Sequence, residues 1–281
     1  MPDLVFASAG GSIVKDKFRQ FNITLPTVQK GAAIVPVRGG PAGLSAVSGL
    51  RLPPNQLLLF RAASNLPADL AQQRTMHELY DSMFQQLTAA IEFGFNLYRK
   101  SAGLVDVVIN GSQAVGGKLQ GPNLDKLILS APVVATWTGP RVAVREAVAR
   151  GLHQQWLKLA ESVKVPGLPW YPSFVAFPGP MAPPTPNVPG PFVLLPHDAS
   201  ATAPSVLKLA MRSSLNGRFD YSDEFFESLA TGFDSALRFW KGVQMVMGVM
   251  GTGPVPNFAP PYIPVGPVVG GSILPGSHIN S

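Results

Sequence analysis

Three long stretches of the chain carry apolar residues at spacings of three and four positions, which places those residues on one face of a helix. The stretches run over residues 76–91, 144–163 and 226–247. Each follows a start pattern in which a small polar residue stands two positions before a proline, as in Thr138-Gly139-Pro140. Asn or Thr can cap the free amides of a helix, and proline is tolerated in its first turn. The pattern therefore predicts three long helices.

The segments around these helices recur in the same order, which indicates an internal repeat. A Pro-Asn pair precedes a short apolar run, the helix follows, and two glycine marks come after it. The apolar runs at residues 57–60, 127–129 and 192–195 are predicted to be strands. Gly39-Gly40-Pro41 supplies the glycine mark of a partial copy at the N-terminus. The predicted organisation is a basic N-terminal segment with a partial repeat over 1–53, then repeats over 54–121, 122–185 and 186–281.

The expected fold is α-rich and mixed α/β. It consists of about three helix-plus-extended-arm repeats, with short strands and long ordered loops rich in glycine and proline. Each amphipathic helix needs a partner for its apolar face, because an isolated helix is marginal in water. The three helices satisfy this need by packing on one another or on helices of other subunits, and the sequence leaves both arrangements open.

Two arms of the chain, residues 165–196 and 242–281, contain no Asp, Glu, Lys or Arg and are rich in proline. Proline lacks a backbone donor, so we predict that neither helix nor regular sheet absorbs these arms. Their aromatic side chains nevertheless favour burial. The arms are therefore predicted to be buried against other subunits. The large aromatic residues expected to anchor that interface are Trp170, Phe174, Phe177, Phe258 and Tyr262.

Charge is scarce and unevenly placed. Charged residues make up 14% of the chain, against about 25% in an ordinary soluble domain. The formal net charge is +6, and residues 1–61 carry seven basic side chains against two acidic ones. This basic segment fits the phosphates of a nucleic acid or an acidic protein neighbour, and the two remain alternatives. Its characteristic residues are Lys15, Lys17, Arg19, Lys30 and Arg38.

Candidate chemistry is weak throughout the sequence. The chain has no cysteine, which excludes disulfides, cysteine-bound zinc and thiol catalysis. Residues 111–118 resemble a phosphate-binding loop, but Ser112 replaces its first glycine and Leu119 its hydroxyl residue, so a glycine-rich hairpin is predicted instead. His197 and Asp198 could pair as acid and base, yet no nucleophile motif accompanies them. The four histidines show no metal-ligand spacing, and we predict no catalytic residue, cofactor or metal.

These observations predict a non-enzymatic structural subunit of a large multi-subunit assembly, such as a virion, a phage tail or a phage-tail-like particle. Its expected partners are copies of itself and other structural proteins. The N-terminus lacks a basic signal-peptide region, and proline interrupts every long uncharged stretch, so we expect synthesis in the cytoplasm and no membrane span. The alternative is a packaging or connector protein whose basic segment contacts nucleic acid. An enzyme with an unrecognised site is the third class.

Overall fold

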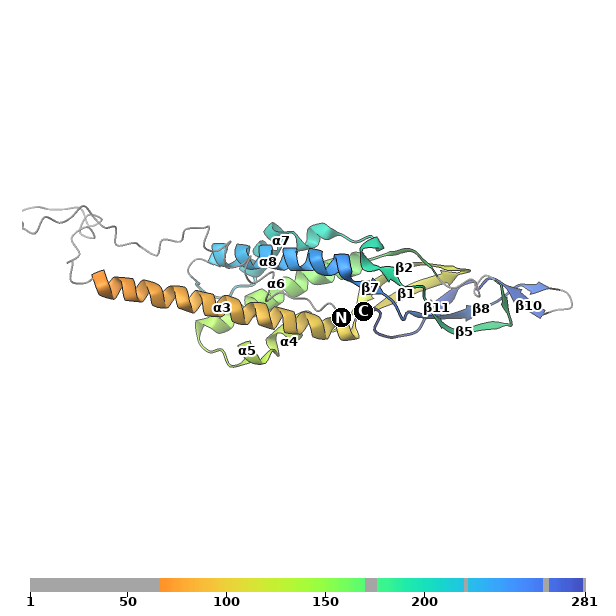
Figure 1. Cartoon of the computed structure of the whole chain (residues 1–281), viewed down its shortest axis with the longest axis horizontal. Coiled ribbons are helices and arrows are strands. Elements are labelled where there is room, and N and C mark those ends of the chain that lie inside the picture. Colours follow the sequence, from red (N-terminus) through yellow and green to blue (C-terminus); the bar gives the residue numbers. More distant parts are fainter. Residues whose placement is uncertain (1–65, 170–175, 220–221, 260–262, 280–281) are drawn as a thin grey trace, which may run out of the picture. The chain divides into compact units, whose positions relative to one another are not determined.

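A computed structural model describes residues 66–169, 176–219, 222–259 and 263–279. These residues form a mixed helix and sheet fold, as the sequence predicts. The chain divides into two compact units within its longest helix, α3 (Leu66–Ser101): one unit includes Phe84–Ser281 and the other ends at Met83. The helices and strands that follow α3, which Figure 1 labels, all belong to the first unit.

Helices α6 (Pro140–Ser162), α7 (Pro204–Ser213) and α8 (Ser222–Val243) pack together in the first unit. The three long helices are confirmed, and α6 and α7 begin at the prolines that the start pattern marks. Asp223 and Glu224 lie in the first turn of α8, where the positive end of the helix dipole favours them.

An aromatic cluster joins α3, α6 and α8. The ring of Phe95 meets Trp156 at 4.9 Å and Trp240 at 5.0 Å, with interplanar angles of 79° and 90°. Phe192 packs against Trp240 at 5.4 Å. Each of these four side chains is at most 1% exposed. Edge-to-face contacts of this kind add to the stabilisation that comes from burial alone, so the cluster forms the core of the helical layer.

Helices α6 and α7 approach each other closely at Gly151. A Cβ atom at this position would lie 2.6 Å from the backbone nitrogen of Met211 and 2.7 Å from its Cα atom. Real Cβ contacts do not reach such distances with backbone atoms, so this crossing requires glycine on α6.

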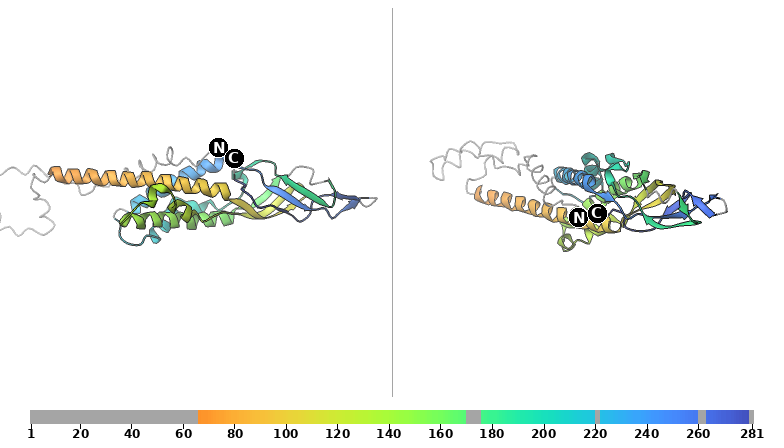
Figure 2. Two further views of the ribbon diagram at one scale, coloured as in Figure 1. Left: turned by 90° about the horizontal axis from the view of Figure 1, so that it is seen from below. Right: turned by 45° about the vertical axis from the view of Figure 1, so that its right-hand side comes forward.

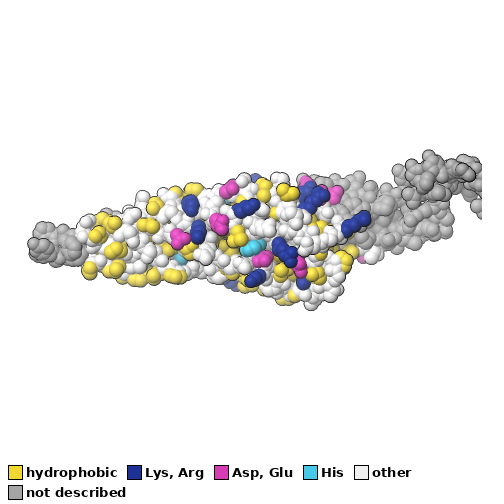
Figure 3. All heavy atoms as spheres, turned by 180° about the vertical axis from the view of Figure 1, so that it is seen from behind, with side chains coloured by type: hydrophobic (Ala, Val, Ile, Leu, Met, Phe, Trp, Pro, Cys, Tyr) yellow, Lys and Arg dark blue, Asp and Glu magenta, His cyan; other side chains and the backbone are white. Residues whose placement is uncertain are grey.

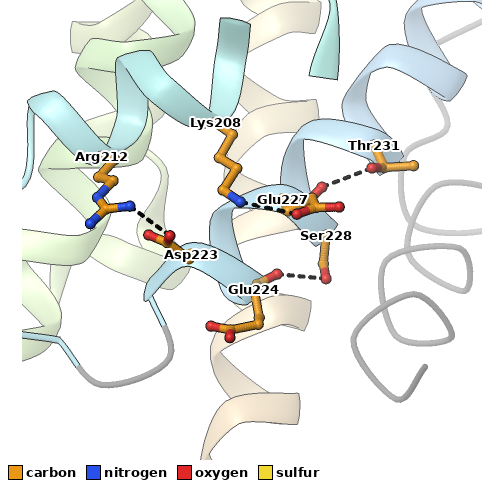
Figure 4. A network of polar contacts seen from close by, with 7 residues as sticks. All are labelled: Lys208, Arg212, Asp223, Glu224, Glu227, Ser228 and Thr231. Carbon is orange, nitrogen blue, oxygen red and sulfur yellow. Dashed lines mark hydrogen bonds and ion pairs between the residues drawn. The ribbon is translucent and has the colours of Figure 1, made fainter. Parts of the chain in front are cut away.

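Ion pairs fix the position of α7 along α8 (Figure 4). Lys208 Nζ lies 3.0 Å from Glu227 Oε2, and Arg212 Nη1 lies 2.6 Å from Asp223 Oδ2. On α8 the hydroxyl of Thr231 donates to the backbone oxygen of Glu227 at 2.8 Å. The charged groups are partly exposed, so each pair contributes little to stability. Together they select one register between two helices whose apolar faces already meet.

Two of the predicted short strands are wrong. Residues 127–129 lie in helix α4 (Leu124–Leu129), and residues 192–194 form the 3₁₀ helix η5 (Phe192–Leu194). A run of three apolar residues does not distinguish a strand from a helical turn, and in α4 the buried pair Leu124 and Ile128 has helical spacing. The remaining predicted strand, residues 57–60 of the first predicted repeat, lies outside the described residues. The order strand, helix, arm is therefore not confirmed for the second and third predicted repeats.

Six antiparallel strands form the main sheet in the order β3-β2-β1-β11-β8-β5. β1 and β2 make a hairpin, which confirms the glycine-rich hairpin predicted around residues 111–118. Gly116 and Gly117 in β2 both have positive φ, a conformation that glycine adopts readily. The strands are β1 (Gly103–Asn110), β2 (Gln113–Gln120), β3 (Val165–Pro169), β5 (Met181–Pro186), β8 (Met250–Pro254) and β11 (Gly271–Ile273).

The two uncharged arms pair with each other in three successive ladders. Along the chain these ladders join β6 to β7, β5 to β8 and β4 to β10, all antiparallel. The prediction that regular sheet does not absorb the arms is therefore wrong for their described residues. Figure 2 shows the sheet in two further views. The remaining strands are β4 (Phe177–Pro178), β6 (Gly190–Pro191), β7 (Met245–Val246), β9 (Phe258–Ala259) and β10 (Ile263–Gly266).

The positions of the prolines explain how the arms enter the main sheet. Pro166 and Pro169 lie in β3, and Pro183, Pro184 and Pro186 lie in β5. β3 and β5 are the two edges of the six-stranded sheet. Between them, β1, β2 and β11 contain no proline, and β8 has only its last residue, Pro254. An edge strand has one side without a neighbour, so a missing N–H there removes no ladder hydrogen bond. The same prolines hinder a further strand from adding to either edge.

Candidate functional site

The predicted interface residues fall partly within the described structure. Phe177 lies half-buried in β4, and Phe258 lies in β9. Both strands pair with β10, so the small sheet β4-β10-β9 brings the two arms together here. Trp170, Phe174 and Tyr262 lie outside the described residues. The basic residues Lys15, Lys17, Arg19, Lys30 and Arg38 also lie outside them.

A hydrogen bond between His197 and Lys241 connects the loop after η5 to helix α8. Lys241 Nζ lies 3.2 Å from His197 Nε2, and His197 Nδ1 lies 2.7 Å from the backbone oxygen of Leu195. A hydrogen on Nδ1 satisfies both contacts, because Nε2 then accepts from the ammonium group. Burial lowers the pKa of Lys241, the carboxylate of Asp234 opposes this, and Arg238 adds to the lowering.

Asp198 does not complete an acid–base pair with His197. Its Oδ1 accepts from the backbone N–H of Ser200 at 2.9 Å and from the Ser200 hydroxyl at 2.5 Å, and so it caps the 3₁₀ helix η6 (Ala199–Thr202). These hydrogen bonds lower the pKa of the Asp198 carboxyl. A hydrolase triad places histidine between the hydroxyl and the carboxylate. Here the carboxylate contacts the hydroxyl directly, and both nitrogens of His197 have other partners.

His278 connects the segment after β11 to the junction of α3 and β1. Its ring is 1% exposed, and Nδ1 accepts a 2.8 Å hydrogen bond from the backbone N–H of Leu104. The backbone N–H of His278 donates to Ala102 at 3.1 Å, and its carbonyl accepts from Met247 at 3.3 Å. Burial lowers the pKa of His278, while a hydrogen bond with the backbone of Leu274 acts in the opposite direction. The acceptor role of Nδ1 requires the neutral ring.

We expect acid to destabilise the protein through His278. Its pKa is lower in the folded than in the unfolded chain, so below about pH 6.5 the unfolded chain binds the proton first. The free energy of unfolding should then decrease as the pH falls from about 6.5 towards the folded pKa. His278→Asn keeps an acceptor for Leu104 without titrating. In thermal melts from pH 7 to pH 5, the melting temperature of this variant should fall less than that of the wild type. Equal falls would contradict the role given to His278.

The small sheet β4-β10-β9 and the strands β5, β8 and β11 of the main sheet form one end of the sheet region, and this end carries no charge. This sheet end comprises the described parts of residues 176–186 and 250–273, which contain no Asp, Glu, Lys or Arg. Three of its hydrophobic side chains are exposed: Met181 by 57%, Val265 by 36% and Val269 by 46%. Figure 3 shows charged side chains over the helical part of the visible face and hydrophobic ones over the sheet end. Surfaces of this kind mark contacts with other proteins more often than chemistry.

A second exposed apolar feature crosses the middle of the sheet. Val108 on β1 and Val115 on β2 lie directly opposite each other, and each is 44% exposed. Val108 also faces Ser272 on β11, and Leu274 follows two residues later with 37% exposure. We call Val108, Val115, Ser272 and Leu274 the valine face. The solvent side of an antiparallel sheet normally carries polar residues at such positions.

The valine face ends at an ion pair. Lys118 Nζ lies 3.5 Å from Asp106 Oδ2, and the two side chains are 45% and 74% exposed. This surface could not be predicted from the sequence, because residues 104–109 are apolar except for Asp106 and hydropathy does not show which of them point outward. The register between β1 and β2 supplies that information.

No protein-family model, no curated protein and no solved structure matches this chain. Within the described residues, no group of three His, Cys, Asp or Glu side chains is placed to hold a metal ion. No helix in the described part of the chain combines the length and the hydropathy needed to cross a bilayer. The exposed apolar side chains of the sheet end and of the valine face are the candidate functional site.

Proposed function

We propose that this chain is a structural subunit of a large multi-subunit assembly, of the kind found in virions, phage tails and phage-tail-like particles. The observation that carries the proposal is the separation of charge in the first unit. Ion pairs lie on the helices and, with Lys118 and Asp106, on strands β1 and β2. The sheet end instead exposes Met181, Val265 and Val269 without a charged residue. An uncharged surface loses little hydration when a neighbour covers it, so it suits permanent contact.

The polar groups of the described residues support a structural role. His197 with Lys241 and His278 with Leu104 join separate elements of the fold, and Asp198 with Ser200 caps η6. The proline-bearing edges β3 and β5 support it further. They hinder growth of the sheet from its edges, which leaves faces and loop tips as the surfaces through which a subunit can associate in a defined way.

A packaging or connector protein that contacts nucleic acid is the second candidate. Its support is the excess of basic over acidic side chains in residues 1–61. Phosphate contacts release counterions, so DNA binding through this segment should weaken steeply as salt increases.

The test is the state of the purified full chain. We expect it to form particles larger than a dimer in sedimentation velocity experiments, with regular objects in electron micrographs, at low and high salt alike. Contacts between uncharged surfaces are insensitive to screening. A chain that stays monomeric at every protein concentration would contradict the proposal. Binding to DNA that disappears with added salt, without particle formation, would favour the second candidate.

A further inference from the structure

We propose that Asn216 is a modification site, at which the side-chain amide converts spontaneously to a mixture of aspartate and isoaspartate. The chain contains two Asn-Gly pairs, Asn110-Gly111 and Asn216-Gly217. Asparagine is prone to this reaction when glycine follows it, because glycine has no Cβ atom to shield its backbone nitrogen. The two pairs have different surroundings in the structure, and these favour the reaction at the second pair.

The reaction needs only groups of the chain itself and water. The backbone nitrogen of the glycine attacks Cγ of the asparagine, and a bond forms between these two atoms. The side-chain nitrogen leaves as ammonia, together with the proton that the backbone nitrogen loses. Water then opens the resulting succinimide ring at either carbonyl carbon, which gives aspartate or isoaspartate without any oxidation or reduction. Such an attack between neighbouring groups is fast where the backbone can bring the two atoms together.

Asn216-Gly217 has the freedom that this attack requires. Both residues are exposed and lie between α7 and α8, outside any helix or strand. Neither residue makes a hydrogen bond to another residue in the part of the chain that the structure describes. Gly217 has a φ of 109°, and a Cβ atom at this position would meet nothing within 4 Å. The backbone therefore has room to turn its nitrogen towards Cγ of Asn216.

Hydrogen bonds restrain the same groups in Asn110-Gly111. The backbone N–H of Gly111, the attacking group, donates to the backbone oxygen of Val268 at 2.6 Å. The side-chain oxygen of Asn110 accepts from the backbone N–H of Gly270 at 2.9 Å, and Asn110 pairs with Gln113 in the ladder between β1 and β2. Attack here requires the end of β1 to open first. Local opening of a hydrogen-bonded strand costs free energy, so it slows the reaction.

The product changes both the charge and the backbone of the segment between α7 and α8. It adds a carboxylate four residues after Arg212, whose guanidinium pairs with Asp223. Isoaspartate also inserts the side-chain methylene into the backbone. In an assembly whose subunits are not exchanged, the product accumulates as the particle ages, and this consequence alone rests on the proposed function.

Peptide mass spectrometry of the aged full chain is the test. Trypsin cleaves after lysine and arginine, so Asn216 is recovered in residues 213–218 and Asn110 in residues 101–118. The purified chain is incubated in mildly alkaline buffer, where the attacking nitrogen loses its proton more readily. Asn216 should deamidate at least about tenfold faster than Asn110. Comparable rates in the folded chain, or a faster rate at Asn110, would overturn the proposal.

Two controls separate the effect of the fold from that of the local sequence. In guanidinium chloride both pairs should deamidate at similar rates, because the hydrogen bonds around Asn110 are lost. A difference that persists in the unfolded chain would contradict the structural explanation. Asn216→Gln should abolish the mass change in residues 213–218, because glutamine would have to close a larger ring. Fragment spectra distinguish the two products, and aspartate without isoaspartate would contradict the succinimide route.

The outcomes separate this inference from the proposed function. Deamidation is measured on the free chain, so its rate at Asn216 does not depend on whether larger particles form. Asn216 that deamidates faster than Asn110 in a chain that stays monomeric would support the modification site and reject the assembly. Particles formed by a chain whose two Asn-Gly pairs react equally would support the assembly and reject the modification site.

Discussion

Replacing Trp240 by alanine should remove about 3–5 kcal/mol of stability, the usual cost of deleting a large buried aromatic side chain. Trp240 on α8 is 1% exposed and contacts Phe95, Trp156 and Phe192, so its removal leaves a cavity where three elements meet. Urea denaturation followed by circular dichroism measures the loss without relying on tryptophan fluorescence.

The neighbouring residue provides the control for this substitution. Phe239 precedes Trp240 on the same helix and is 65% exposed. Phe239→Ala should change stability by no more than about 0.5 kcal/mol, because surface substitutions away from special features are usually neutral. Similar losses for the two variants would mean that the aromatic cluster is not the core of the helical layer.

Replacing Gly151 by valine should destabilise the fold by about 3 kcal/mol or more, the upper part of the range for an overpacked site. The first added carbon would already lie 2.6 Å from the backbone nitrogen of Met211, so the side chain cannot turn away from the contact. Helices α6 and α7 must separate to admit it. The measurement is the urea midpoint of the purified variant, with the wild type run in parallel.

Replacing Gly242 by valine is the control, because this glycine does not contact another helix. It lies near the end of α8, and a Cβ atom there would meet nothing within 4 Å. Gly242→Val should be close to neutral, since valine is slightly better than glycine in a helix. A Gly151→Val variant as stable as Gly242→Val would show that α6 and α7 do not cross as closely as the structure has them.

Local sequence signals predicted the helices and failed for the short apolar runs. Pro140 and Pro204 mark helix starts because the first turn has no intrahelical partner for their missing N–H. Spacings of three and four then identified α6 and α8 over most of their length. Residues 127–129 offered only one apolar turn, which suits a strand and a helix equally, and tertiary packing made it helical.

The pairing of the arms could not be predicted from proline content. Whether proline excludes a segment from a sheet depends on the strand's position, edge or centre, and that position is a tertiary property. Thr185 pairs with Gly251 and Pro178 pairs with Val265, contacts far apart in sequence that no local pattern specifies. The valine face could not be predicted for the same reason, since Val108 and Val115 become neighbours only through the hairpin register.

The uneven placement of proline also bears on how the chain is made. Synthesis completes β1 long before β11, whose Gly271 pairs with Ile109. Until then β1 is an open edge, and its residues 107–109, Val-Val-Ile, have high strand propensity and no proline to block pairing. The prolines therefore protect the edges of the finished sheet but not those of a nascent chain. A polypeptide released from the ribosome before β11 presents an unprotected strand and is prone to aggregate, so cells must complete or degrade it quickly.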